Sequence, residues 1–288
     1  MPGLSGQTRG VLLLLLAMFV LSCMDVCNKW LAPQYSALQA VWFRYAVFLA
    51  FGLWFCRTQG LARALRSRRP GLQVLRSLMA VTQNSLVIAS LAHVPLADVM
   101  AIMQASPLIA TLLAAPLLGE RVGLARWLSV AVGFSGVLLI LRPGLGVLDP
   151  WAFAALAASA LFAGYQLLTR QVAAHDTWQT TFLMTALPAW LLASAPLPFV
   201  WRMPADALAW AAFLAAGACA SIGHYLMIKA LQQSEASALQ PFNYTVLLWA
   251  VLFGLLLFAE WPDLATVAGA LLIVAGGLLA FRPARRPL

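Results

Sequence analysis

Hydrophobic side chains fill long stretches of this chain, and most polar residues lie in the short connections between them. A run of about 20 apolar residues is long enough to cross the hydrocarbon core of a bilayer as a helix. The pattern therefore predicts ten membrane-spanning helices and no additional soluble domain. These helices are expected at residues 10–31, 36–56, 72–92, 97–118, 123–141, 151–170, 178–200, 207–229, 238–258 and 264–281.

The composition indicates that lipid is the solvent of these segments. Hydrophobic residues make up 63% of the 288 residues and charged residues 9%, whereas roughly 25% of the residues of a soluble domain are charged. One aqueous core cannot cover so many apolar side chains. The predicted fold class is an all-α integral membrane protein.

The second half of the chain repeats the first half with an offset of 140 residues. The stretch Ala101–Pro143 has a second copy in which Glu120 aligns with Glu260 and Gly136 aligns with Gly276. Matches among leucines and alanines carry little information in so apolar a chain, but an aligned acid and glycine are informative. A duplicated unit of about half the chain is therefore expected. The predicted five-helix repeats are residues 1–145 and 146–288.

Basic residues are concentrated in alternate connections. If the N-terminus is cytoplasmic, most of the 18 Lys and Arg residues fall on the cytoplasmic side, including the run from Arg57 to Arg76. The positive-inside rule then predicts a multi-pass protein of a bacterial-type inner (plasma) membrane with both termini in the cytoplasm. We interpret the basic run as a solvated loop beside anionic lipid and not as a nucleic-acid site.

Five helices in each repeat have a consequence for symmetry. An odd number of crossings makes the second repeat enter the membrane from the opposite side, so the two repeats are inverted. Secondary transporters use this design and bind their substrates near the membrane midplane, where the repeats meet. Neither a membrane enzyme nor a scaffold requires it, and the pattern favours a transporter that works by alternating access.

The duplicated unit resembles a known family. Each copy has an apolar helix, an acidic turn at Glu120 or Glu260 and a glycine-bearing helix, and in this it resembles the drug/metabolite transporter superfamily, in its ten-helix EamA-type branch. The length and tryptophan content also resemble the YddG-type aromatic amino acid exporters. The resemblance covers almost the whole chain. It implies export of small metabolites through a central cavity lined mainly by the first, third, fourth and ninth helices and their repeat mates.

Polar and helix-kinking residues inside the apolar segments are candidates for substrate binding or gating, because polar groups in lipid are costly. Asp25 and Lys29 stand one helical turn apart and either form an internal ion pair or take part in substrate access. Pro107 is expected to kink the fourth helix and to free a backbone carbonyl near Gln104. The candidate set is Ser22, Asp25, Asn28, Asn84, Gln104, Pro107, Phe162, Tyr165, Gln166, Ser221, His224, Asn243 and Trp249.

Depth in the membrane divides these candidates into two vestibules and a midplane. His224, the repeat mate of Asn84, is either a hydrogen-bonded interior histidine or a proton relay. Glu120 and Glu260 are expected to cap helices or pair with loops. The outer set is Asp25, Asn28, Lys29, Asn84 and Gln104; the inner set is Tyr165, Gln166, His224 and Asn243; the midplane set is Ser22, Ala80, Pro107, Phe162, Ser221 and Trp249.

The candidates also suggest a substrate class. Aromatic side chains on the inner half suit an apolar or aromatic substrate side chain, and neutral groups such as Asn84 and His224 suit an amino acid's ammonium and carboxylate. The sequence therefore predicts export of neutral and aromatic amino acids. The alternatives are a multidrug or other metabolite exporter of the same superfamily and a membrane protein that does not transport.

Several classes of chemistry have no motif in the sequence. There is no glycine-rich phosphate loop after a strand, no metal-ligand spacing and no catalytic serine, histidine and acid arrangement. We therefore expect neither an enzyme nor a bound cofactor or metal. The expected partners are a small-molecule substrate and membrane lipid, without nucleic acid, and the expected assembly is a monomer or a weak oligomer.

Overall fold

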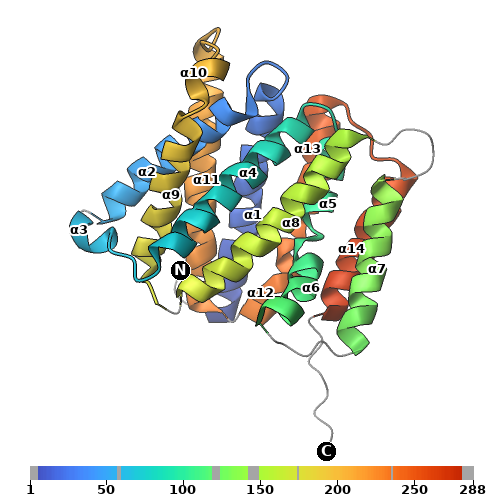
Figure 1. Ribbon diagram of the computed structural model, residues 1–288. Coiled ribbons are helices and arrows are strands. Elements are labelled where there is room, and N and C mark those ends of the chain that lie inside the picture. Colours follow the sequence, from blue (N-terminus) through green and yellow to red (C-terminus); the bar gives the residue numbers. More distant parts are fainter. Residues whose placement is uncertain are drawn as a thin grey trace, which may run out of the picture.

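The computed structural model describes residues 6–56, 60–118, 124–141, 149–173, 175–234 and 236–280, and these residues form helices without strands (Figure 1). The helices of the first half are α1 (Gly6–Leu31), α2 (Ala37–Cys56), α3 (Leu61–Ala64), α4 (Pro70–Leu91), α5 (Leu96–Met103), α6 (Ser106–Leu118) and α7 (Leu124–Leu141). Those of the second half are α8 (Pro150–Ala173), α9 (Trp178–Ser194), α10 (Leu197–Val200), α11 (Ala207–Gln233), α12 (Ala236–Asn243), α13 (Thr245–Phe258) and α14 (Leu264–Ala280).

The helices follow the predicted segments closely. Within the described residues, seven segments are long and apolar enough to cross a membrane. The 17-residue α9 and the shorter apolar helices α7 and α14 account for the other three predicted segments. The seventh segment is the one that differs, because α9 ends at Ser194 and the short helix α10 follows separately. Prolines at 196 and 198 lack the backbone N–H groups that would continue the helix.

The fourth and ninth spans are each broken in the middle. The first break lies at Gln104 and Ala105, between α5 and α6, and the second lies at Tyr244, between α12 and α13. The two breaks are 140 residues apart, which is the offset of the sequence repeat. Discontinuous helices at corresponding positions of two repeats are a feature of transporter binding regions.

The kink at Pro107 has the predicted position, but the carbonyl that it frees is not bare. Proline cannot donate to the carbonyl four residues earlier, which belongs to Met103. The Ser159 hydroxyl of α8 donates to that oxygen at 3.3 Å. A neighbouring helix therefore satisfies the group that we expected to be open to a substrate.

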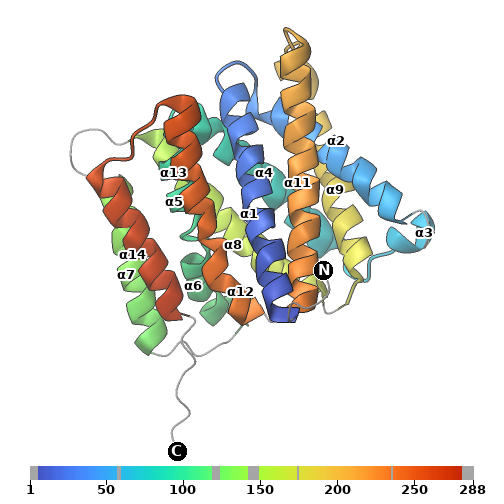
Figure 2. The ribbon, with the colours of Figure 1, turned by 180° about the vertical axis from the view of Figure 1, so that it is seen from behind.

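The helices α7 and α14 lie side by side at one edge of the bundle (Figures 1 and 2). Glycines let them approach closely: a Cβ atom on Gly136 would lie 2.4 Å from the Gly269 carbonyl oxygen, and one on Gly276 would lie 2.6 Å from the Ser129 carbonyl oxygen. Small residues allow this backbone approach in membranes. A shift of 140 residues converts the first contact into the second, so the contact obeys the two-fold relation of the repeats. The expected boundary at 145/146 lies outside the described residues.

Arg76 ties three helices together at the end of the bundle where α4 begins. Although the sequence places it in the basic run, it is 1% exposed and lies inside α4. Its guanidinium donates to Gln73 Oε1 and the Thr181 carbonyl at 2.7 Å each, to Thr185 Oγ1, and to Thr169 Oγ1 at 3.3 Å. These bonds join α4 to α8 and α9, and Arg76 is a structural residue and not a solvated charge.

The α8–α9 connection is fixed at the same end by Asp176. Its carboxylate accepts hydrogen bonds from Ser67 Oγ, from the Arg68 backbone N–H at 2.8 Å and from Gln73 Nε2 at 2.8 Å. Partial burial acts to raise the pKa of Asp176, but these hydrogen bonds outweigh it, and the pKa lies below its ordinary value. The ionised carboxylate thus holds the segment before α4 against the connection between α8 and α9.

Candidate functional site

One side of α1 carries a row of buried polar groups. The helix lies between α11 and α13 (Figure 2), and Ser22, Asp25, Asn28 and Lys29 are each at most 8% exposed. Ser22 Oγ and Asn28 Oδ1 have no hydrogen-bond partner, and Asp25 makes no side-chain hydrogen bond or ion pair among the described residues. Buried polar atoms are nearly always partnered, so these three groups are candidates to contact a substrate.

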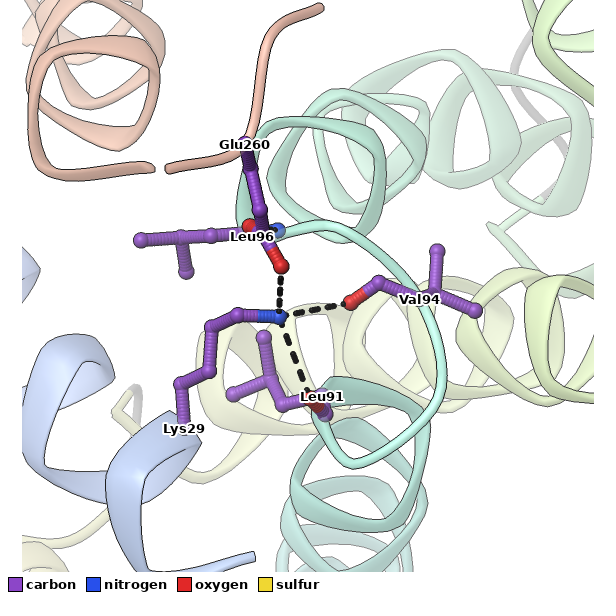
Figure 3. Close-up of polar contacts among 5 residues, drawn as sticks. All are labelled: Lys29, Leu91, Val94, Leu96 and Glu260. Carbon is purple, nitrogen blue, oxygen red and sulfur yellow. Dashed lines mark hydrogen bonds and ion pairs between the residues drawn. The ribbon is translucent and has the colours of Figure 1, made fainter. Parts of the chain in front are cut away.

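Lys29 does not pair with Asp25, so the predicted internal ion pair is wrong. Its Nζ lies 2.7 Å from Glu260 Oε1 instead, in the connection between α13 and α14 (Figure 3). Glu260 also accepts a hydrogen bond from the Leu96 backbone N–H at 2.9 Å, which confirms its predicted capping and pairing role. Glu120, its repeat mate, lies outside the described residues. Asp25 is left without a neutralising neighbour on its own helix.

Arg44 of α2 is the cation that faces this row. Its Nη1 donates to Asn84 Oδ1 at 2.7 Å, and Asn84 Nδ2 in turn donates to Tyr45 Oη at 3.0 Å and to the Ala80 carbonyl at 2.7 Å. The guanidinium also acts electrostatically on the Asp25 carboxylate. The sequence analysis did not include Arg44, although a lone arginine within an apolar segment is itself a signal of an interior partner.

His224 of α11 approaches the same guanidinium from the second repeat. Its Nδ1 lies 2.8 Å from the Ala220 carbonyl, and since a carbonyl only accepts, Nδ1 carries the proton. Arg44 acts electrostatically on the ring. Asn84 and His224 are repeat mates, so the structure brings the two onto one cation and does not separate them into outer and inner vestibules. We call Asp25, Arg44, Asn84 and His224 the polar centre.

Aromatic rings lie in two groups close to the polar centre. Phe48 packs edge-on against His224 at 5.6 Å between ring centroids and stacks on Phe182 at 4.0 Å. In the second group Phe19 of α1 meets Trp249 of α13 edge-on at 4.9 Å. Trp249 thus forms part of an aromatic wall against α1, the helix that carries Asp25.

The remaining candidates are spread over other parts of the bundle. Gln104 ends α5 at the first break and Pro107 lies in the first turn of α6, while Asn243 ends α12 at the second break. Ser221 Oγ donates to the Gly217 carbonyl of its own helix at 2.9 Å. Two further candidates, Phe162 and Tyr165, stack on each other on α8, and Gln166 beside them is exposed on the surface of the bundle.

Comparisons with known proteins fit this architecture. Residues 8–142 and 149–282 each match the EamA-like transporter family. A riboflavin transporter of Rhizobium johnstonii is 31% identical over 95% of this chain and 91% of its own, and the pseudopaline exporter CntI of Pseudomonas aeruginosa is 29% identical over 92% and 93%. One solved structure, titled only as the crystal structure of a protein, has a TM-score of 0.65 at 18% identity and covers 95% of this chain and 96% of that chain, which shows a shared fold.

Two buried serines test whether the row on α1 is held for a ligand. Ser22 and Ser221 are 2% and 1% exposed, but only Ser221 has a hydrogen-bond partner. Ser221→Ala is expected to lower the free energy of unfolding by about 0.5–1.5 kcal/mol, whereas Ser22→Ala removes an unpaired group and is expected to leave it unchanged or to raise it. Unfolding temperatures in detergent measure the difference. Equal destabilisation by both variants would show that Ser22 has a structural partner.

Proposed function

Because this chain belongs to the EamA-like transporter family, and is a multi-pass membrane transporter of small molecules and not an enzyme, we propose that it exports neutral amino acids, aromatic ones included. The observation that carries the proposal is a pair of buried opposite charges that are not bonded to each other. Asp25 has no hydrogen bond or ion pair among the described residues, and Arg44 is bonded to a neutral amide. A substrate with one charge of each sign satisfies both.

An α-amino acid has the required groups. Its ammonium suits the Asp25 carboxylate and the unpartnered acceptor oxygens of Ser22 and Asn28 on the same side of α1. Its carboxylate suits the forked guanidinium of Arg44, a geometry that binds carboxylates well. Fixed charges in the interior are costly unless they are paired. The sequence analysis assigned this task to neutral groups, and the proposal now adds one charge of each sign.

The aromatic groups beside the polar centre support the substrate side chain. Phe48 and Phe182 stack on the side of His224, and Phe19 and Trp249 pack on the side of α13. Each edge-to-face or offset contact with a substrate ring contributes about 0.5–1.5 kcal/mol beyond the burial of area. Phenylalanine and tryptophan therefore rank above small or charged amino acids in the proposal.

Alternating access follows from the origin of the polar centre. Asp25, Arg44 and Asn84 come from the first half of the chain and His224 comes from the second. Rocking of one repeat against the other changes which end of this centre reaches water, as in other transporters built from inverted repeats. The relative named as a pseudopaline exporter supports export as the direction.

A flat heteroaromatic metabolite is the second candidate substrate. The relative named as a riboflavin transporter is 31% identical over 95% of the chain, and aromatic walls suit a flat ring system. An uncharged ring system gives no partner to the buried Asp25 carboxylate, and for this reason the amino acid proposal ranks first.

The substrate proposal is tested by counterflow in proteoliposomes. Labelled phenylalanine and tryptophan are expected to show saturable flux, and Asp25→Asn is expected to reduce it about tenfold or more, because a hydrogen bond to a charged group contributes about 1.5–3 kcal/mol. Gln166→Ala, on the exposed surface of α8, is the matched control and is expected to transport normally. Flux of riboflavin, a nucleotide sugar or a quaternary ammonium dye without flux of any neutral amino acid would refute the proposal.

We also propose that both termini and the connection between α2 and α4 face the cytoplasm. Cysteine labelling checks this orientation in a variant without the four native cysteines. Arg66→Cys is expected to react with a membrane-impermeant thiol reagent only after the cells are permeabilised. Trp261→Cys at the opposite end, where the native side chain is 83% exposed, is expected to react in intact cells. The reverse pattern would contradict the proposed orientation.

A further inference from the structure

The ion pair between Lys29 and Glu260 closes one end of the space above the polar centre (Figure 3). Lys29 ends α1 one turn beyond Asp25, and Glu260 lies in the connection between α13 and α14. Backbone groups of the α4–α5 connection complete the contact. We call Lys29, Glu260 and these backbone groups of Leu91, Val94 and Leu96 the outer latch.

Every hydrogen atom of the Lys29 ammonium has an acceptor in the outer latch. Besides Glu260 at 2.7 Å, Nζ donates to the Val94 carbonyl at 3.0 Å and to the Leu91 carbonyl at 3.3 Å. An ammonium has three N–H groups, so its donors are used up. Leu91 ends α4, and a cation beside the last carbonyls of a helix is favoured by the helix dipole.

Glu260 is bound as completely from the other side. Its Oε1 meets Lys29, and its Oε2 accepts the Leu96 N–H at the start of α5, where an anion is favoured by the dipole. Ala259 before it has φ 54°, the left-handed conformation that glycine adopts most easily, and it is the one non-glycine residue with a positive φ in the described part of the chain. The Glu260 N–H closes this turn on the Gly254 carbonyl at 2.9 Å.

A permanent brace and a gate differ in position and in exposure. The outer latch joins the end of α1, in the first repeat, to the α13–α14 connection, in the second repeat. Cross-repeat contacts at one end of the molecule have to break when inverted repeats rock. The Glu260 side chain is 25% exposed, against 9% for Lys29. Water therefore reaches the carboxylate and can replace its partner when the pair separates.

We infer that the outer latch is the gate at the outer end of the transport path. The inference rests on the proposed alternating access. While Lys29 holds Glu260 and the end of α4, the polar centre is closed at this end. When the pair breaks, α1 and the α13–α14 connection separate, and Asp25 becomes accessible from this side.

Accessibility of a buried cysteine tests the gate without any substrate. Ser22→Cys, at a side chain that is 2% exposed, is placed in a chain that lacks the native cysteines, and its reaction rate with a membrane-impermeant thiol reagent is measured. Intact cells and inverted vesicles are both used, so that the orientation of the chain does not decide the result. Glu260→Gln removes the charge but keeps an oxygen for the Leu96 N–H. We expect it to raise the rate from the outer side about tenfold or more, because loss of one partner of a charge pair shifts an equilibrium by that much.

Two further variants complete the design. Lys29→Met breaks the latch from the other side while Glu260 still caps α5, so it serves if Glu260→Gln does not fold, and the same rise is expected. Trp261→Ala is the matched control in the same connection and is expected to change nothing. Unchanged rates in folded Glu260→Gln and Lys29→Met proteins would overturn the gate. Raised rates without amino acid flux would retain the gate and reject only the proposed substrate.

Discussion

Lipid offers no hydrogen bonds, so each polar group inside the bundle has to find its partner within the protein. Most do: the guanidinium of Arg76 has partners on α4, α8 and α9, and Ser159 satisfies the carbonyl that Pro107 frees. Six buried side-chain atoms of the described residues lack a partner, and two of them flank Asp25 on α1. Such exceptions in a membrane interior are functional candidates, and here they lie beside a carboxylate that also lacks one.

One offset of 140 residues relates features that are physically unlike. It connects the two helix breaks, exchanges the two close contacts of α7 with α14, and pairs Asn84 with His224 on either side of Arg44. The symmetry therefore extends from the backbone into the polar centre. Two similar packings of nearly equivalent repeats are the physical basis of rocking, because each contact at one end has a related contact at the other. The gate inferred at Lys29 and Glu260 is the described contact that this motion most directly opposes.

Much of the fold could be predicted from the sequence, because hydropathy and repeat spacing are local properties. The ten segments and the kink at Pro107 follow from them. Partner choice does not. Asp25 is one turn from Lys29 and is its natural partner by spacing, yet Glu260 satisfies Lys29 from 231 residues away, together with helix-end carbonyls that no sequence pattern reveals. Gln166 shows a second limit: a polar residue in an apolar helix suggested an interior site, but its helix turns it outward.

The central claim is that the polar centre recognises a zwitterion through Asp25 and Arg44. Equilibrium binding to the purified protein tests it most directly, with labelled phenylalanine as the ligand and two analogues as competitors. Phenylalanine amide lacks the carboxylate, and N-acetylphenylalanine lacks the ammonium. The account predicts that each analogue competes at least about tenfold more weakly than phenylalanine, since each leaves one buried charge without a partner. Equal competition by phenylalanine and both analogues would contradict it.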